Sequence, residues 1–314
     1  MAEELHVVRN QKDTVFRMLF QEKKELLELY NALNNSAYHS TEDLIIFTLE
    51  NAIYMNFKND ISFLLDSELN LYEHQASYNP NMPLRDLVYI AKQLEKYMRD
   101  ESIYSSTLVK IPMPRFVVFY NGTDRQPEKQ ILRLSDAFEK ETAEPELELK
   151  VLMLNINFGH NQELMEKCRT LREYSQYVDR VRKYAKRMRI EEAVERAVTE
   201  CTREGILADF LSSQRAEVIA VSIFEYNEEE EMRKIRDSEY KSGKEDGIAQ
   251  GIACGETEAI ISLIRKKSEK GFGINEIADI LELDVCYAKK VLDLLAENPD
   301  KTDMQVAELI IGQV

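Results

Sequence analysis

Two apolar runs constrain the fold of this chain more than any other feature. They are "RFVVFYNG", which Asn121-Gly122 ends, and "LELKVLMLNINF", which ends before residue 159. Successive side chains of a strand point to opposite faces of a sheet, so a strand that is apolar at consecutive positions is buried on both faces. The sequence therefore predicts an α/β fold, with a sheet that helices cover on both sides.

The remaining elements of the first half can be placed from periodicity. Apolar residues recur at helical spacing from Asp13 to Leu33, which predicts an amphipathic helix. Strands are expected at 45–49, 60–65 and 70–76, and a helix is expected after Pro83 as far as Arg99. The predicted order is helix, three strands, helix, and then the two apolar strands.

The second half reads as helical. After Asn161 the chain has almost no proline until Pro299, and between them four glycines recur every fourth residue, at 243, 247, 251 and 255. An interior glycine costs a helix about 1 kcal/mol relative to alanine, so the repeat needs a reason. Close packing against another helix, for instance between protomers of a homo-oligomer, is one explanation, and a loose linker is the other.

The last segment, "INEIADILELDVCYAKKVLDLL", has apolar spacing similar to that of a helix-turn-helix. Residues 271–297 hold six acidic residues and two lysines, which disfavours insertion into a DNA groove. We therefore divide the chain into a core (1–160), a helical extension (161–240), a glycine-spaced helix or linker (241–270) and a helix-turn-helix-like tail (271–314).

Composition limits the classes of function. The formal charge of −16 repels polyanions on average, so any contact with nucleic acid needs a local basic patch or metal ions. The longest apolar runs are too short to span a membrane, the N-terminus lacks the apolar core of a signal peptide, and the four cysteines form no CxxC pair. These features predict a cytoplasmic protein without a membrane partner.

The stretch "NDISFLLDSELNLYEHQAS", residues 59–77, predicts a hairpin that carries acids. A tight turn at Asp66-Ser67 places Asp60 opposite Glu73, whereas a turn one residue later places Asp60 opposite Gln75. Two facing carboxylates about 5 Å apart repel by roughly 3 kcal/mol at an effective dielectric constant near 20. A Mg²⁺ ion between them removes that cost, so the hairpin predicts a metal site; acids that simply point into water are the alternative.

His74 falls on the opposite face of its strand, together with Tyr72 and Ala76. This position favours a histidine packed in the core over a metal-binding imidazole. The backbone carbonyl of His74 remains a candidate metal ligand.

The hairpin resembles a known motif. Asp60 followed by Glu73-His74-Gln75 is similar to the PD-(D/E)xK nuclease motif, with glutamine in the position of the lysine and Asn59 in that of the proline. Further stretches resemble the recombination-promoting nuclease and putative transposase family of bacteria, and the resemblance covers roughly residues 12–260. These stretches are "KDTVFRMLF", "NPNMPLRDLVYIAKQLEKY", "VVFYNGT" and "AVTECTREGILADFLSSQRAEVIAVSIFEYNEE".

The resemblance implies a restriction-endonuclease-like core, that is, a mixed β-sheet flanked by helices, and a metal-dependent DNA endonuclease linked to recombination or transposition. It assigns Asp60, Glu73 and His74 to Mg²⁺ or Mn²⁺, and Asp60, Glu73 and Gln75 to catalysis. Gln75 can orient the attacking water but cannot accept its proton. The alternative is a non-catalytic DNA-binding or assembly protein that retains the nuclease fold.

Two surfaces are candidates for DNA contact. On the helix after the hairpin, the side opposite the apolar stripe Leu87, Ile90, Ala91, Leu94 and Met98 suits stacking and phosphate contact; packing beneath the helical extension is the alternative. The segment "YVDRVRKYAKRMR" is the most concentrated basic stretch, although the acids at 228–231 could balance it. The predicted DNA-binding residues are Arg85, Tyr89, Gln93 and Tyr97 on the first surface and Arg180, Lys183, Lys186 and Arg187 on the second.

Overall fold

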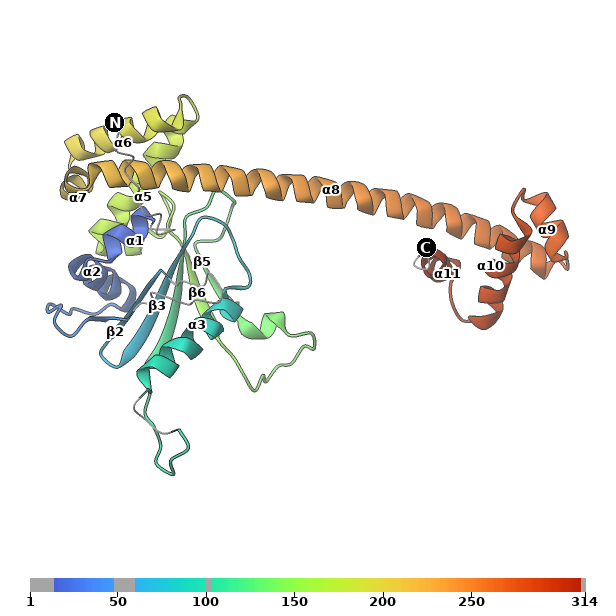
Figure 1. The fold of residues 1–314 in the computed structure, drawn as a ribbon, viewed down its shortest axis with the longest axis horizontal. Coiled ribbons are helices and arrows are strands. Elements are labelled where there is room, and N and C mark those ends of the chain that lie inside the picture. Colours follow the sequence, from blue (N-terminus) through green and yellow to red (C-terminus); the bar gives the residue numbers. More distant parts are fainter. Residues whose placement is uncertain (1–13, 48–59, 100–102, 312–314) are drawn as a thin grey trace, which may run out of the picture. The chain divides into compact units, whose positions relative to one another are not determined.

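A computed structural model describes residues 14–47, 60–99 and 103–311 of the chain. The chain divides into two compact units, residues 1–230 and residues 231–314 (Figure 1). This division is coarser than the four parts expected from the sequence, which remain a prediction.

The first unit is built on a mixed sheet of six strands in the order β1-β2-β3-β4-β6-β5. The three central strands β3, β4 and β6 run parallel, and the outer pairings are antiparallel. The α/β class is therefore confirmed. The strands are β1 (Ile45–Ile46), β2 (Ile61–Leu65), β3 (Glu68–Gln75), β4 (Met113–Tyr120), β5 (Lys129–Arg133) and β6 (Lys150–Asn155).

Helices cover both faces of this sheet, as the apolar strands predicted (Figure 1). In β4, Val117 and Phe119 belong to one core cluster, with α1, α2 and α5, whereas Val118 and Tyr120 belong to the other, with α3. A continuous apolar run is therefore needed to fill both cores. The helices of these two layers are α1 (Val15–Phe20), α2 (Lys23–Asn34), α5 (Arg169–Ala185) and, on the opposite face, α3 (Met82–Tyr97).

The N-terminal helix differs from the prediction of one helix over 13–33. It is two helices that break at Gln21-Glu22, and the side chain of Thr14 caps α1 by accepting a hydrogen bond from the Arg17 amide. Asp13 lies outside the described residues, as do positions 48 and 49 of the first predicted strand.

The chain after β6 is mostly helical, as predicted. In the first unit, α5, α6 and α7 pack on the α1 side of the sheet, and α8 continues into the second unit, whose core contains Ile261, Ile277, Val291 and Val306. The remaining elements are a 3₁₀ helix (Leu134–Ala137), α4 (Gln162–Lys167), α6 (Ile190–Glu204), α7 (Ala208–Ser213), α8 (Arg215–Glu269), α9 (Ile274–Ile280), α10 (Val285–Glu297) and α11 (Asp303–Ile311).

The four regularly spaced glycines all lie inside α8, so they belong to a helix and not to a loose linker. A Cβ atom added at any of them would meet no atom within 4 Å. Close packing on this stripe is therefore absent within the described chain, and an oligomer formed through it remains a prediction. Within the same described ranges, no helix has the length and apolarity needed to cross a bilayer.

Candidate active site

The β2–β3 hairpin has the first of the two predicted registers. Asp66 and Ser67 form its turn with positive φ angles of 50° and 61°, the conformation of a two-residue hairpin turn that matches the twist of the strands. Ile61 pairs with Tyr72, so Asp60 lies opposite Glu73 at the open end of the hairpin. The register that would pair Asp60 with Gln75 is wrong.

Hydrogen bonds hold the two acids together. The backbone N–H of Asp60 donates to Glu73 Oε1 over 3.1 Å, and the backbone N–H of His74 donates to Asp60 Oδ2 over 2.7 Å. Each carboxylate thus accepts from the backbone of the strand that carries the other. The geometry fixes where both groups lie before any ligand binds.

Glu73 does not point into water, because only 2% of its surface is exposed. Burial raises its pKa well above the usual value, and the nearby carboxylates of Asp60 and Asp86 raise it further. Arg85 opposes this effect, with Nη2 3.6 Å from Glu73 Oε2. A buried carboxylate in this setting needs either a proton or additional positive charge, so the solvated-hairpin alternative fails for Glu73.

The placement predicted for helix α3 is right for Leu87, Ile90 and Leu94, which pack against the core, but wrong for its outer side. Tyr89 and Gln93 were expected on its outer side, but they are 1% and 0% exposed and face the sheet, while Ala91 of the predicted core stripe is exposed. Gln93 Nε2 donates to Ser62 Oγ of β2 over 2.8 Å. Neither side chain has surface with which to stack on a base.

The other two residues predicted for DNA contact on α3 differ from each other. Arg85 is half-buried and donates from Nη2 to the Tyr89 hydroxyl over 3.1 Å, beside Glu73. Tyr97, in the last turn, is exposed. Of the four, only Tyr97 has the outward position that was expected, and Arg85 instead forms part of the acidic site.

Asp86 is the site residue that sequence reasoning missed. It is 1% exposed, its Oδ1 atom has no hydrogen-bond donor, and burial raises its pKa to about 7, with Arg85 acting in the opposite direction. Gln93 Oε1 is also buried without a donor. The otherwise apolar layer between α3 and the sheet therefore contains a buried polar patch. The available signal was the helical spacing of Met82, Asp86, Tyr89, Ile90 and Gln93.

Asp86→Asn is expected to change how stability depends on pH. The folded-state pKa lies above the unfolded value, so the native state holds more protons than the unfolded chain between about pH 4 and 7, and stability falls as pH rises through this window. Removing the charge should stabilise the protein at pH 8 by up to about 4 kcal/mol, and by much less at pH 4.

Urea unfolding at pH 4, 6 and 8 in EDTA measures this effect. The exposed Asp136 provides the control, since Asp136→Asn should retain the wild-type slope of stability against pH. A wild-type slope in Asp86→Asn as well would show that Asp86 is not a buried, protonated acid.

The half-buried His74 packs against the core on the strand face that was predicted. Its ring stacks on Phe16 with centroids 5.0 Å apart, and Nε2 is 3.0 Å from the Tyr174 hydroxyl. Burial lowers the pKa of His74 below its usual value, and Arg182 adds to the shift. The imidazole therefore points away from the acids, which leaves the backbone carbonyl as the metal ligand to be considered.

Gln75 ends β3 two residues after Glu73 and so shares its face of the sheet. The backbone carbonyl of Gln75 accepts a hydrogen bond from the backbone N–H of Asn121 over 2.9 Å, which fixes the end of β3 against the end of β4. Gln75 is thereby placed at the same edge as the two acids.

The donor set at this edge fits a hard divalent cation. The part of the chain that the structure describes contains no cluster of three His, Cys, Asp or Glu side chains arranged for a metal ion. Two carboxylates and a backbone carbonyl nevertheless suffice for Mg²⁺, which retains several of its own waters. Asp60, Glu73 and the His74 carbonyl are the atoms that would hold it.

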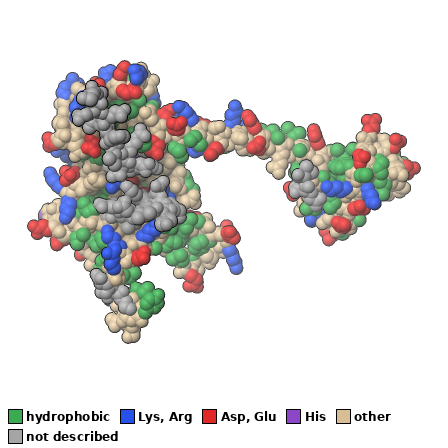
Figure 2. Space-filling model, in the orientation of Figure 1, with side chains coloured by type: hydrophobic (Ala, Val, Ile, Leu, Met, Phe, Trp, Pro, Cys, Tyr) green, Lys and Arg blue, Asp and Glu red, His purple; other side chains and the backbone are tan. Residues whose placement is uncertain are grey.

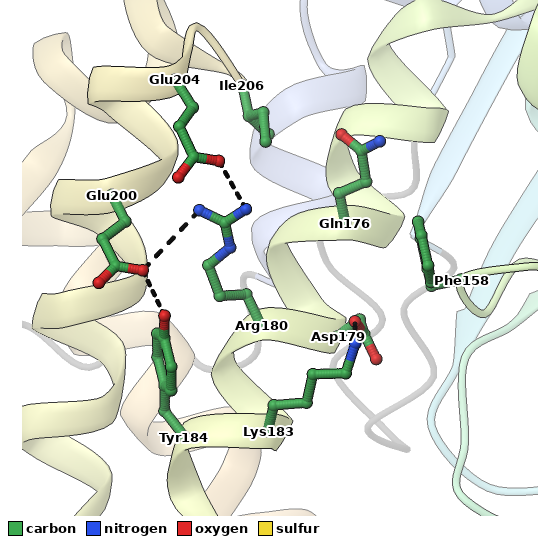
Figure 3. Close-up of a pocket in the computed structure, with 9 residues that line it drawn as sticks. All are labelled: Phe158, Gln176, Asp179, Arg180, Lys183, Tyr184, Glu200, Glu204 and Ile206. Carbon is green, nitrogen blue, oxygen red and sulfur yellow. Dashed lines mark hydrogen bonds and ion pairs between the residues drawn. The ribbon is translucent and has the colours of Figure 1, made fainter.

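The basic helix α5 is less cationic than its sequence suggests. Arg180 donates to Glu204 over 2.7 Å and lies near Glu200, and Lys183 pairs with Asp179 at 2.6 Å (Figure 3). Lys186 and Arg187 are exposed. Acidic and basic side chains are also interspersed on the face drawn in Figure 2. The compensating acids include Asp179, Glu200 and Glu204, and Glu229 of the predicted 228–231 run pairs with this helix through Arg182.

Comparisons with protein-family models, with curated proteins and with solved structures find no match to this chain.

Proposed function

We propose that this chain is a metal-dependent DNA endonuclease with a restriction-endonuclease-like core, of the PD-(D/E)xK type, which acts in recombination or transposition. The observation that carries the proposal is the pair Asp60 and Glu73, held together at one end of the hairpin with Glu73 buried. Two facing carboxylates destabilise the isolated hairpin because they repel each other. A divalent cation that the nuclease reaction requires would remove this repulsion, and so explains why both acids are present.

Each residue of the motif has a separate role. Asp60, Glu73 and the His74 carbonyl would hold Mg²⁺ or Mn²⁺, which when bound polarises the scissile phosphate and lowers the pKa of the attacking water. Gln75 donates or accepts a hydrogen bond to orient that water, but its uncharged amide does not take the proton. Arg85, half-buried beside Glu73, limits the negative charge of the site before the ion binds.

Cutting of supercoiled plasmid tests the proposal. We expect nicked and linear products with Mg²⁺ or Mn²⁺ and none with EDTA, because the two carboxylates act only through the ion. Glu141→Gln, which changes an exposed carboxylate in the loop before β6, should cut like the wild type. Equal cutting in EDTA and Mg²⁺ would contradict the assignment of the acids to a metal.

A second function has its own support. Gln75 replaces the motif lysine, and Arg85 already lies 3.6 Å from Glu73, so the acids have a cationic neighbour without a metal. A non-catalytic DNA-binding or assembly protein would retain this arrangement. Protein that shifts DNA in a gel but never nicks it in Mg²⁺ or Mn²⁺ would favour this second function.

A further inference from the structure

A pocket of about 380 Å³ lies beyond the carboxyl ends of β4 and β6. Its walls come from the loop after β4, the residues that follow β6, and helix α5. In open α/β sheets, ligands commonly bind outside the carboxyl ends of the strands. The bond between the Asn121 amide and the Gln75 carbonyl ties this edge to the end of β3, so the pocket lies along the same edge as the acidic pair.

The back wall of the pocket is a fixed network around Arg182. Its Nη1 atom donates to Asn121 Oδ1 and to Asn157 Oδ1, both over 3.0 Å, and Nη2 pairs with Glu229 at 3.1 Å. Asn157 Nδ2 in turn donates to the carbonyl of Gly122 over 3.0 Å. Because these side chains satisfy one another, Arg182 holds the wall in place and is not a free cation.

Two other basic side chains of the pocket lie outside the Arg182 network. Arg125 comes from the loop after β4 and Lys186 from the end of α5, and both are exposed. A further basic residue, Lys183, also lines the pocket. It pairs with Asp179, and its ammonium group lies 5.6 Å from the centre of the Phe158 ring. Four basic side chains thus line a pocket with two acidic ones, in a chain whose net charge is −16.

This combination is that of a phosphoryl-binding site. Guanidinium and ammonium groups form charge-assisted hydrogen bonds with phosphate oxygens, and a rigid wall of amides reduces the ordering needed on binding. The two exposed cations come from different elements of the fold. Arg125 and Lys186 are 61 residues apart in the sequence and line the same pocket because the end of β4 and the end of α5 converge here.

We propose that this pocket binds a backbone phosphate of the DNA strand, close to the phosphate that reacts at Asp60 and Glu73. The position relative to the reacting phosphate rests on the proposed function, whereas the recognition of a phosphoryl group rests on the pocket itself. Free inorganic phosphate offers the same chemistry, so both sources belong in the test.

The double variant Arg125→Ala/Lys186→Ala tests the proposal, because neither residue belongs to the Arg182 network. Fluorescence anisotropy of a labelled duplex in EDTA measures affinity without cutting. We expect affinity to fall about tenfold at low salt, and the slope of log K against log salt to become shallower by roughly 0.9, the change for one lost phosphate contact.

The control is Lys110→Ala/Lys140→Ala, which makes the same change in net charge at exposed positions outside the pocket. Equal affinity and salt slope in the two double variants would overturn the proposal. Binding of inorganic phosphate to the protein alone is then measured by calorimetry. Micromolar phosphate binding by the wild type that is lost in Arg125→Ala/Lys186→Ala, with no difference in duplex affinity between the double variants, would assign the pocket to a small phosphate and overturn the DNA assignment.

The proposed nuclease function and the proposed phosphate pocket can be contradicted independently of each other. A wild type that never cuts in Mg²⁺, while Arg125→Ala/Lys186→Ala loses duplex affinity, supports the pocket and contradicts the endonuclease. A wild type that cuts, with KM and duplex affinity unchanged in the double variant, supports the endonuclease and overturns the pocket.

Discussion

Glu73→Gln is expected to reduce Mg²⁺-dependent plasmid cutting by roughly 100- to 1000-fold, the loss typical when a group that stabilises charge in the transition state is removed. The carboxamide has nearly the same shape as the carboxylate, but it is neutral and does not balance a divalent cation. Asp60→Asn should have a similar effect, since the two carboxylates face one another across the hairpin.

The Glu73→Gln variant should remain folded and be at least as stable as the wild type. The charged carboxylate is buried and its pKa is raised, so at pH 8 its ionisation costs folding free energy that the amide does not. Thermal unfolding in EDTA at pH 8 measures this, with Glu141→Gln as the control for both assays. Wild-type cutting by Glu73→Gln would contradict the metal site, and a lower melting temperature would contradict the burial argument.

Gly122→Ala is expected to cause a large loss of stability. An added Cβ would lie 2.3 Å from the carbonyl oxygen of Ala76 and 2.5 Å from the Tyr120 hydroxyl. The first of these atoms is backbone at the end of β3 and cannot rotate away, so the strand ends must separate. We expect about 3 kcal/mol of destabilisation, which lowers the melting temperature of a unit of this size by roughly 10 °C.

The glycines of α8 provide the matched control. A Cβ at Gly243 or Gly247 meets nothing within 4 Å, and alanine suits a helix better by about 1 kcal/mol. Calorimetry of Gly122→Ala, Gly243→Ala and Gly247→Ala should therefore show a loss only for the first. An unchanged melting temperature in Gly122→Ala would mean that β3 and β4 do not approach so closely at this edge.

The sheet and the hairpin could be predicted because their signals are local. Strand β4 carries apolar residues on both faces, so its burial follows from its own sequence. The hairpin itself is also a local feature, but its sequence allowed two turns, and the structure selects the one at Asp66-Ser67 that places Asp60 opposite Glu73. Burial of the strand and presence of the hairpin need no feature of distant residues.

The orientation of α3 could not be predicted in the same way. Its inner side carries the buried Gln93 because the face of the sheet beneath it carries Ser62, to which Gln93 donates, and Asp86 is buried on the same side of the helix. An apolar stripe is a poor guide where the opposing surface mixes polar and apolar side chains. Strand β5 was missed for a related reason, since it is an edge strand in which only Leu132 is buried.

The first turn of α1 depends on a partner far along the chain. The backbone N–H of Val15 donates to Glu225 of α8 over 3.3 Å, across 210 residues of sequence. At ribosomal rates of about 5–20 residues per second, Glu225 is synthesised roughly 10–40 s after Val15. Arg182 likewise forms its ion pair with Glu229 only after residue 229 has been synthesised. The newly made polypeptide therefore completes the edge that carries both the acids and the pocket beside Arg182 only after most of the first unit has been synthesised.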